Sequence, residues 1–145
     1  MSADRAVRTG SAEETAALGA ELAYGLEAGD VVVVSGDVGT GKSTLIRGAA
    51  RSLGVEGPIA SPTFTIGRRY RGRLPVSHLD LYRLGSLEAE EPGLLDDYLT
   101  PDAIAFVEWP AAAEPSLRRI AARVRLRHAG GDERIVEISP AAYLP

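Results

Sequence analysis

A buried strand that runs directly into a glycine-rich loop is the feature that most restricts how this chain can fold. Residues 31–34 are four valines, a pattern typical of a strand buried on both faces in a parallel sheet. Residues 36–43 follow as GDVGTGKS, which matches G-x-x-x-x-G-K-[ST]. Residues 42–53 then favour a helix, with Gly54 as its C-terminal stop. Strand, loop and helix in this order predict a phosphate-binding loop.

The residue types in this loop suit the chemistry of holding phosphate. Gly36, Gly39 and Gly41 let the backbone bend so that successive N–H groups point at one anion, and the following helix adds its positive dipole end. Lys42 is expected to reach the β- and γ-phosphates, and Ser43 to offer its hydroxyl to magnesium. Lys42 is also the single lysine among 16 basic residues, at a place where a compact ammonium fits better than a planar guanidinium. The competing interpretation is a chance glycine-rich turn before a helix.

Length and composition indicate one globular domain over residues 1–145, with 45% hydrophobic residues. The net charge of −4 argues against a chain whose main task is to coat nucleic acid. The absence of cysteine excludes disulfides and thiolate metal sites. No apolar run is long enough to cross a bilayer, and the first residues lack the apolar core of a secretory signal. We therefore expect a cytoplasmic protein.

The remaining elements are expected to build a mixed sheet. A capping-box spacing between Ser11 and Glu14 predicts a helix over residues 11–27. Buried strands and hairpins are expected from alternating or continuous apolar patterns, and short helical pieces from the segments between them. The expected strands are residues 64–71, 76–81, 103–107, 124–128 and 135–139, and the short helical segments are 86–99 and 111–120.

Two acidic residues are candidates for the chemistry of hydrolysis, which needs a further magnesium carboxylate and a group that positions water. Glu108 follows the strand at 103–107, and ligands of parallel sheets gather at the carboxyl ends of the strands, so Glu108 should face the loop. Asp80 lies within the expected strand 76–81. The alternatives are a rim carboxylate for Glu108 and an outward-facing polar strand residue for Asp80.

Other polar and aromatic residues carry weaker signals. Trp109 is either a partly buried core residue, or a nucleotide contact or partner surface beside Glu108. His78 and His128 have no metal-ligand companion at a useful spacing, and we interpret both as structural. The basic segment at residues 68–73 is either a solvated strand or turn, or a contact for an acidic partner or RNA.

The order of four motifs resembles the TsaE (YjeE) family, small bacterial ATPases needed for the threonylcarbamoyladenosine modification of transfer RNA. The motifs are GDVGTGKSTLIRG, SPTFT at 61–65, HLDLYRL at 78–84 and VEWP at 107–110. The resemblance implies an α/β fold, a P-loop NTPase-like three-layer sandwich with a central mixed, mainly parallel β-sheet. Three departures concern Ser43, where threonine is frequent, the basic stretch after SPTFT, and Ala111, where an acidic residue is frequent.

The resemblance also implies roles for individual residues. ATP would bind Asp37, Val38, Gly39, Thr40, Gly41, Lys42, Ser43 and Thr44, with Ser43 and Glu108 on Mg2+. Asp80 and Glu108 would serve catalysis. Thr63 would lie near the γ-phosphate, Ser11 and Thr15 would approach the adenine, and Trp109 would border the site.

The implied partners are TsaD, which carries out the threonylcarbamoyl transfer, and TsaB. Slow ATP turnover would reset their complex between rounds, so this chain would be a Mg-dependent ATPase and not the transferase. Two alternatives remain. A small-molecule kinase would use residues 68–73 as its only lid candidate. A nucleotide-dependent adaptor would bind ATP without hydrolysing it.

Overall fold

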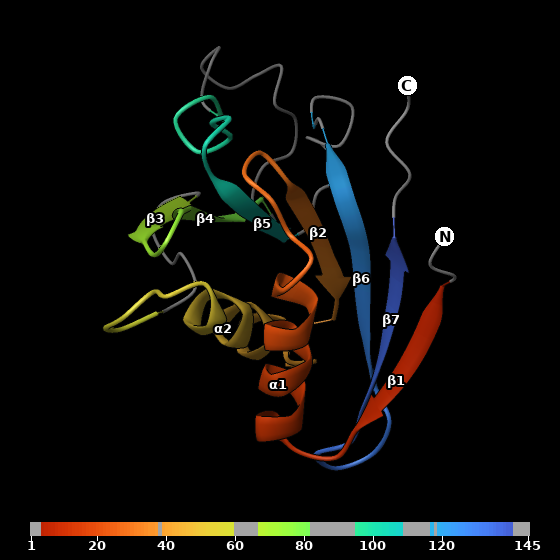
Figure 1. Cartoon of the computed structure of the whole chain (residues 1–145). Helices are drawn as coiled ribbons and strands as arrows, with labels where there is room; N and C mark the ends of the chain where they lie inside the picture. Colours follow the sequence, from red (N-terminus) through yellow and green to blue (C-terminus); the bar gives the residue numbers. More distant parts are fainter. Residues whose placement is uncertain are drawn as a thin grey trace.

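The computed structural model describes residues 4–37, 39–59, 67–81, 95–108, 117 and 119–140. Within these residues, seven strands form one sheet in the order β1-β7-β6-β2-β5-β4-β3 (Figure 1). The strands are β1 (Arg5–Thr9), β2 (Val31–Gly36), β3 (Gly67–Arg71), β4 (Pro75–Asp80), β5 (Ile104–Glu108), β6 (Ile120–His128) and β7 (Arg134–Pro140). Two described helices, α1 (Ala12–Ala23) and α2 (Lys42–Ser52), pack on this sheet.

The sheet is mixed, as expected, and its parallel part lies in the centre. β6, β2, β5 and β4 are mutually parallel, so their carboxyl ends lie at one edge of the sheet. β3, β7 and β1 each pair antiparallel with their neighbours. Antiparallel ladders therefore make up both flanks of the sheet. Their share of the strand pairs is larger than the expectation of a mainly parallel sheet implied.

Both described helices cover the same face of the sheet (Figure 1). Val32 and Val34 of β2 point to this face and pack with Leu45 of α2, while Val31 and Val33 point to the opposite face. On that face they meet Leu79, Leu81 and Leu95. The valine run is thus buried on both sides, which confirms its interpretation as a central strand.

α1 and α2 pack backbone to backbone through two glycines. A Cβ placed on Gly19 would lie 2.0 Å from the carbonyl oxygen of Leu45, and one placed on Gly48 would lie 2.0 Å from that of Ala16. No side chain fits at either position. This close packing fixes the middle of α1 against the middle of α2, the helix that begins where the glycine-rich loop ends.

Three elements differ from the sequence-based expectation. The helix expected over residues 11–27 ends at Ala23, because residues 27–30 form a turn in which the Glu27 N–H donates to the Asp30 carboxylate. β1 was not predicted, since a five-residue edge strand gains its order from pairing with the distant β7. β6 begins at Ile120, so the end of the segment expected to be helical at 111–120 is a strand beside β2.

The expected segments at 64–66, 86–94 and 111–116 lie outside the described residues. Among the described residues, no helix combines the length and the hydropathy needed to span a bilayer.

Replacement of Gly48 by alanine tests the helix contact. Gly48→Ala must push the Ala16 carbonyl away, so we expect the free energy of unfolding to fall by about 1–3 kcal/mol or more, measured by urea denaturation. Gly25→Ala is the matched control, because nothing lies within 4 Å of a Cβ there. The close packing of α1 on α2 is refuted if both variants unfold at the same urea concentration.

Candidate nucleotide-binding site

The glycine-rich loop leaves the end of β2 and enters α2 directly, as the sequence predicts. Gly36, Gly39 and Gly41 have φ angles of 144°, 80° and 100°, a region that side chains disfavour. A Cβ on Gly36 would also lie 2.6 Å from the carbonyl oxygen of Leu126 in β6. The loop can therefore turn closely over the sheet only because these positions are glycines.

Contacts inside the loop hold its turn. The Thr40 side chain is buried, and its hydroxyl donates to the carbonyl oxygen of Asp37 at 2.6 Å, with the Thr40 N–H reaching the same oxygen at 3.2 Å. Gly41 is the N-cap of α2 in the left-handed conformation. The first N–H groups of a helix have no intrahelical partner, and the described first turn of α2 carries no acidic residue. This end of α2 is therefore electrostatically suited to an anion.

Lys42 is buried at this point, with 7% of its surface exposed. Its Nζ donates to the carbonyl oxygens of Gly36 at 2.6 Å and Asp37 at 3.0 Å. Burial lowers the pKa of Lys42 below 10.5, although the nearby carboxylates of Glu108, Asp80 and Asp37 act to raise it. The ammonium is thus short of stabilising charge in the free protein, and a bound phosphate would supply it.

The two candidate carboxylates lie side by side at the carboxyl ends of their strands. Asp80 of β4 is in register with Glu108 of β5, which is in register with Val34 of β2. Alternation along the strands places both side chains on the face that α2 covers. Glu108 is buried and Asp80 is partly buried. The geometry agrees with the expectation that Glu108 faces the loop, and it gives Asp80 the same face.

His78 contacts Glu108, a feature that sequence reasoning missed. The His78 Nε2 lies 2.5 Å from Glu108 Oε2, and the two side chains are 2% and 5% exposed. The spacing of two between His78 and Asp80 does place them on one face of a strand. The sequence offers no sign of the register that brings β5 alongside, so the partner of His78 was not predictable.

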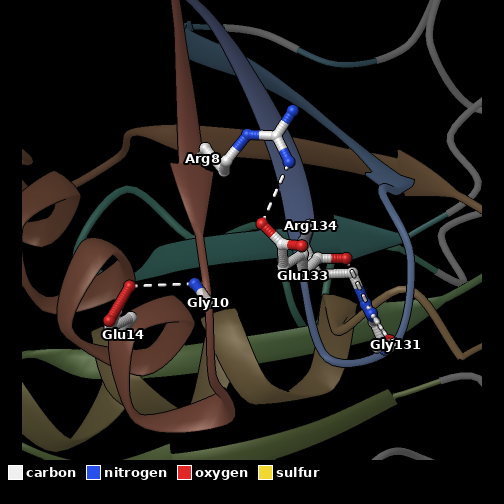
Figure 2. A network of polar contacts seen from close by, with 6 residues as sticks. All are labelled: Arg8, Gly10, Glu14, Gly131, Glu133 and Arg134. Carbon is white, nitrogen blue, oxygen red and sulfur yellow. Dashed lines mark hydrogen bonds and ion pairs between the residues drawn. The ribbon is translucent and has the colours of Figure 1, made fainter.

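The start of α1 forms one neighbour of the loop. The hydroxyls of Thr9 and Thr15 lie 2.7 Å apart in a buried contact, and a Cβ on Gly41 would lie 3.6 Å from Thr15 Cγ2. Ser11 caps α1 by accepting from the Glu14 N–H at 3.1 Å. The Glu14 carboxylate accepts from the Gly10 N–H, as Figure 2 shows, and not from that of the cap residue. Of the two residues expected near adenine, Thr15 therefore lies against the loop, and Ser11 caps the N-terminus of α1.

The turn between β6 and β7 forms another neighbour, which the sequence did not reveal. Arg134 donates through Nη2 to the carbonyl oxygen of Gly39 at 3.2 Å, and through Nη1 to those of Gly131 and Glu133. Glu133 in turn pairs with Arg8 of β1 at 3.0 Å (Figure 2). The C-terminal hairpin thus holds the loop from outside and is itself tied to the first strand.

The remaining predicted residues divide into two groups. Ser43 and Thr44 lie partly buried in the first turn of α2, directly after Lys42. Val38, Thr63 and Trp109 lie outside the described residues.

The described side chains fit magnesium that is shared with a nucleotide. In the part of the chain that is described, no cluster of three or more His, Asp or Glu side chains could hold an ion. Magnesium commonly takes only one or two protein oxygens and completes its shell with phosphate and water. The hard oxygens of Ser43, after the loop, and Glu108, at the adjoining strand end, are of the type it prefers.

Comparison with known proteins yields one consistent family. Residues 9–136 match the family described as "Threonylcarbamoyl adenosine biosynthesis protein TsaE". A Bacillus subtilis protein named as a tRNA threonylcarbamoyladenosine biosynthesis protein TsaE is 39% identical over 88% of this chain and 80% of its own length. A protein of the same name from Streptomyces coelicolor is 42% identical, over 79% of this chain and 80% of its own.

A solved structure agrees with the sequence relatives. The crystal structure of YdiB from Bacillus subtilis matches with a TM-score of 0.76 and 33% identity, over 98% of this chain and 88% of that one. The phosphate-loop geometry, the mixed sheet and these similarities lead to the same conclusion: the chain belongs to the TsaE family.

Proposed function

We propose that this chain binds ATP with Mg2+ at the glycine-rich loop and hydrolyses it slowly in support of threonylcarbamoyladenosine formation on tRNA. The proposal is carried by the position of Lys42, Asp80 and Glu108 at the carboxyl ends of three neighbouring strands, where both carboxylates are close enough to influence the Lys42 pKa. The names of the relatives support the pathway.

Each residue has a distinct task in this proposal. The loop N–H groups and Lys42 hold the β- and γ-phosphates, while Ser43 and Glu108 hold Mg2+. Bound magnesium would neutralise charge that develops on the phosphate oxygens. Asp80 lies beside Glu108 and orients the attacking water or accepts its proton. Thr15 and the Arg134 hairpin keep the loop in shape from its two sides.

The proposed partners are TsaD and TsaB, and the proposed place of action is the cytoplasm. Hydrolysis would reset the transferase complex between rounds, with no transfer chemistry on this chain. The kinase alternative required residues 68–73 as a lid, but Arg68 and Arg71 lie in β3, which pairs with β4 along its length. No observation therefore favours the kinase.

Lys42→Ala tests nucleotide binding. We expect this variant to lose ATP binding measurable by calorimetry, because it removes the buried charge that meets the phosphates. Arg51→Ala, in the last turn of the same helix, is the control and should bind as the wild type does. Normal ATP binding by Lys42→Ala would show that the loop is not the phosphate site.

Asp80→Asn tests hydrolysis. The amide keeps the size of the side chain but cannot accept a proton, so we expect ATP turnover in the presence of TsaB and TsaD to fall by about 100-fold or more. ATP affinity should stay within a few-fold. Unchanged turnover would remove Asp80 from catalysis, and a wild-type protein without turnover would favour the adaptor alternative.

Arg134→Ala tests the support of the loop. Loss of the hydrogen bond to Gly39 should leave more of the loop to be ordered on binding, so we expect the ATP dissociation constant to rise about 2- to 10-fold, on the scale of one hydrogen bond. Arg127→Ala is matched to it, because Arg127 pairs with Glu137 in the same hairpin and makes no described contact with the loop. Equal affinities for the two variants would contradict the support role.

A further inference from the structure

The contact between His78 and Glu108 has two features that an ordinary core histidine lacks. Both side chains are almost fully buried, and the His78 Nε2 approaches one carboxylate oxygen, Oε2, at 2.5 Å. Two acceptors would not approach so closely, so one proton lies between His78 Nε2 and Glu108 Oε2. A Glu108 that binds a metal would be ionised and acceptor-only, and the imidazole would then be the donor. Among the described residues, the His78 Nδ1 has no hydrogen-bond partner. The histidine is thus oriented by the carboxylate alone, within the part of the chain that is described.

The location of the pair argues for a task beyond stability. A buried polar pair rarely adds more stability than apolar side chains of the same size would. This pair lies on the helix-covered face at the carboxyl end of β5, one strand from the loop, in a region otherwise packed with apolar residues such as Phe106 and Val76. Burial of this pair costs desolvation, which the contact between the two side chains offsets in part.

The charges around Glu108 show why the orientation of its carboxylate needs to be held. Asp80 lies in register with it on the same face, and Lys42 is close enough for Glu108 to raise its pKa. The Glu108 carboxylate lies between the negative charge of Asp80 and the positive charge of Lys42. It could turn toward Lys42, and its oxygens would then be unavailable to a metal ion. The contact with His78 engages Oε2, so Oε1 is the oxygen that would be offered to a metal.

We propose that His78 is a positioning residue for Mg2+, which holds the Glu108 carboxylate so that its second oxygen can bind the metal of the nucleotide complex. The inference rests on the proposed function of Glu108 as a metal ligand. Residues that orient metal ligands through hydrogen bonds contribute strongly to metal affinity, and their loss commonly weakens it about 10- to 100-fold.

The test separates metal binding from nucleotide binding. Calorimetry would measure ATP affinity with EDTA and with Mg2+, and Mn2+ binding to the ATP complex would be followed by electron paramagnetic resonance. We expect His78→Phe, which keeps a ring but removes the donor, to weaken Mn2+ and Mg2+ binding about 10- to 100-fold. ATP affinity in EDTA should stay at the wild-type value.

Two amide variants keep the test decisive even if His78→Phe does not fold. The glutamine amide reaches the position of the imidazole Nε2, whereas the asparagine amide reaches only that of Nδ1. We expect His78→Gln to keep most of the metal affinity and His78→Asn to lose it. Ser77→Ala is the matched control, since the buried Ser77 bonds to the Tyr98 carbonyl on the other face of the sheet.

The outcomes distinguish this inference from the proposed function. Wild-type protein whose ATP binding does not respond to Mg2+ would overturn both. A wild-type response to Mg2+ that all His78 variants share would overturn the positioning role alone. Equal losses of ATP affinity in EDTA and in Mg2+, or an equal loss of metal affinity in Ser77→Ala, would show that His78 acts only through the stability of the sheet.

Discussion

The burial of one ammonium group at the start of α2 is the interaction on which the rest of this structure depends. The buried Lys42 ammonium is hydrogen-bonded to two loop carbonyls and lies in the field of three carboxylates. Its loss of hydration nevertheless lowers its pKa. A charge in that position is stable only if the loop carbonyls point inward, which the positive φ angles of the glycines permit.

The loop is held in this form by segments from both ends of the chain. α1 lies directly on α2 because Gly19 and Gly48 allow the backbones to touch, and this brings Thr15 against Gly41. The Arg134 hairpin contacts Gly39 from the other side and is linked to β1 through Glu133. The flanking antiparallel strands are therefore part of the site, since they carry the turn that supports the loop.

The boundary between what could and could not be predicted follows sequence distance. The strand, loop and helix around Lys42 are local, and their apolar pattern and glycines indicated them correctly. Glu108 could be placed because the carboxyl ends of parallel strands share one edge. The contacts of His78 with Glu108 and of Arg134 with Gly39 could not, because they join residues that are 30 and 95 positions apart. Strand register and hairpin docking decide those contacts, and neither leaves a periodic signal in the sequence.

The balance of charge at the site gives a reason why metal and nucleotide would act together in the proposed function. Asp37, Asp80 and Glu108 all influence Lys42, so a bare polyphosphate approaching this ammonium also approaches three carboxylates. Magnesium would turn part of that repulsion into attraction, provided that one carboxylate presents an oxygen to it. The buried His78 contacts the Glu108 carboxylate and limits its orientation. Asp80 lies beside it and is less buried. Two neighbouring acids in different surroundings can in this way take different tasks, one toward the metal and one toward the attacking water.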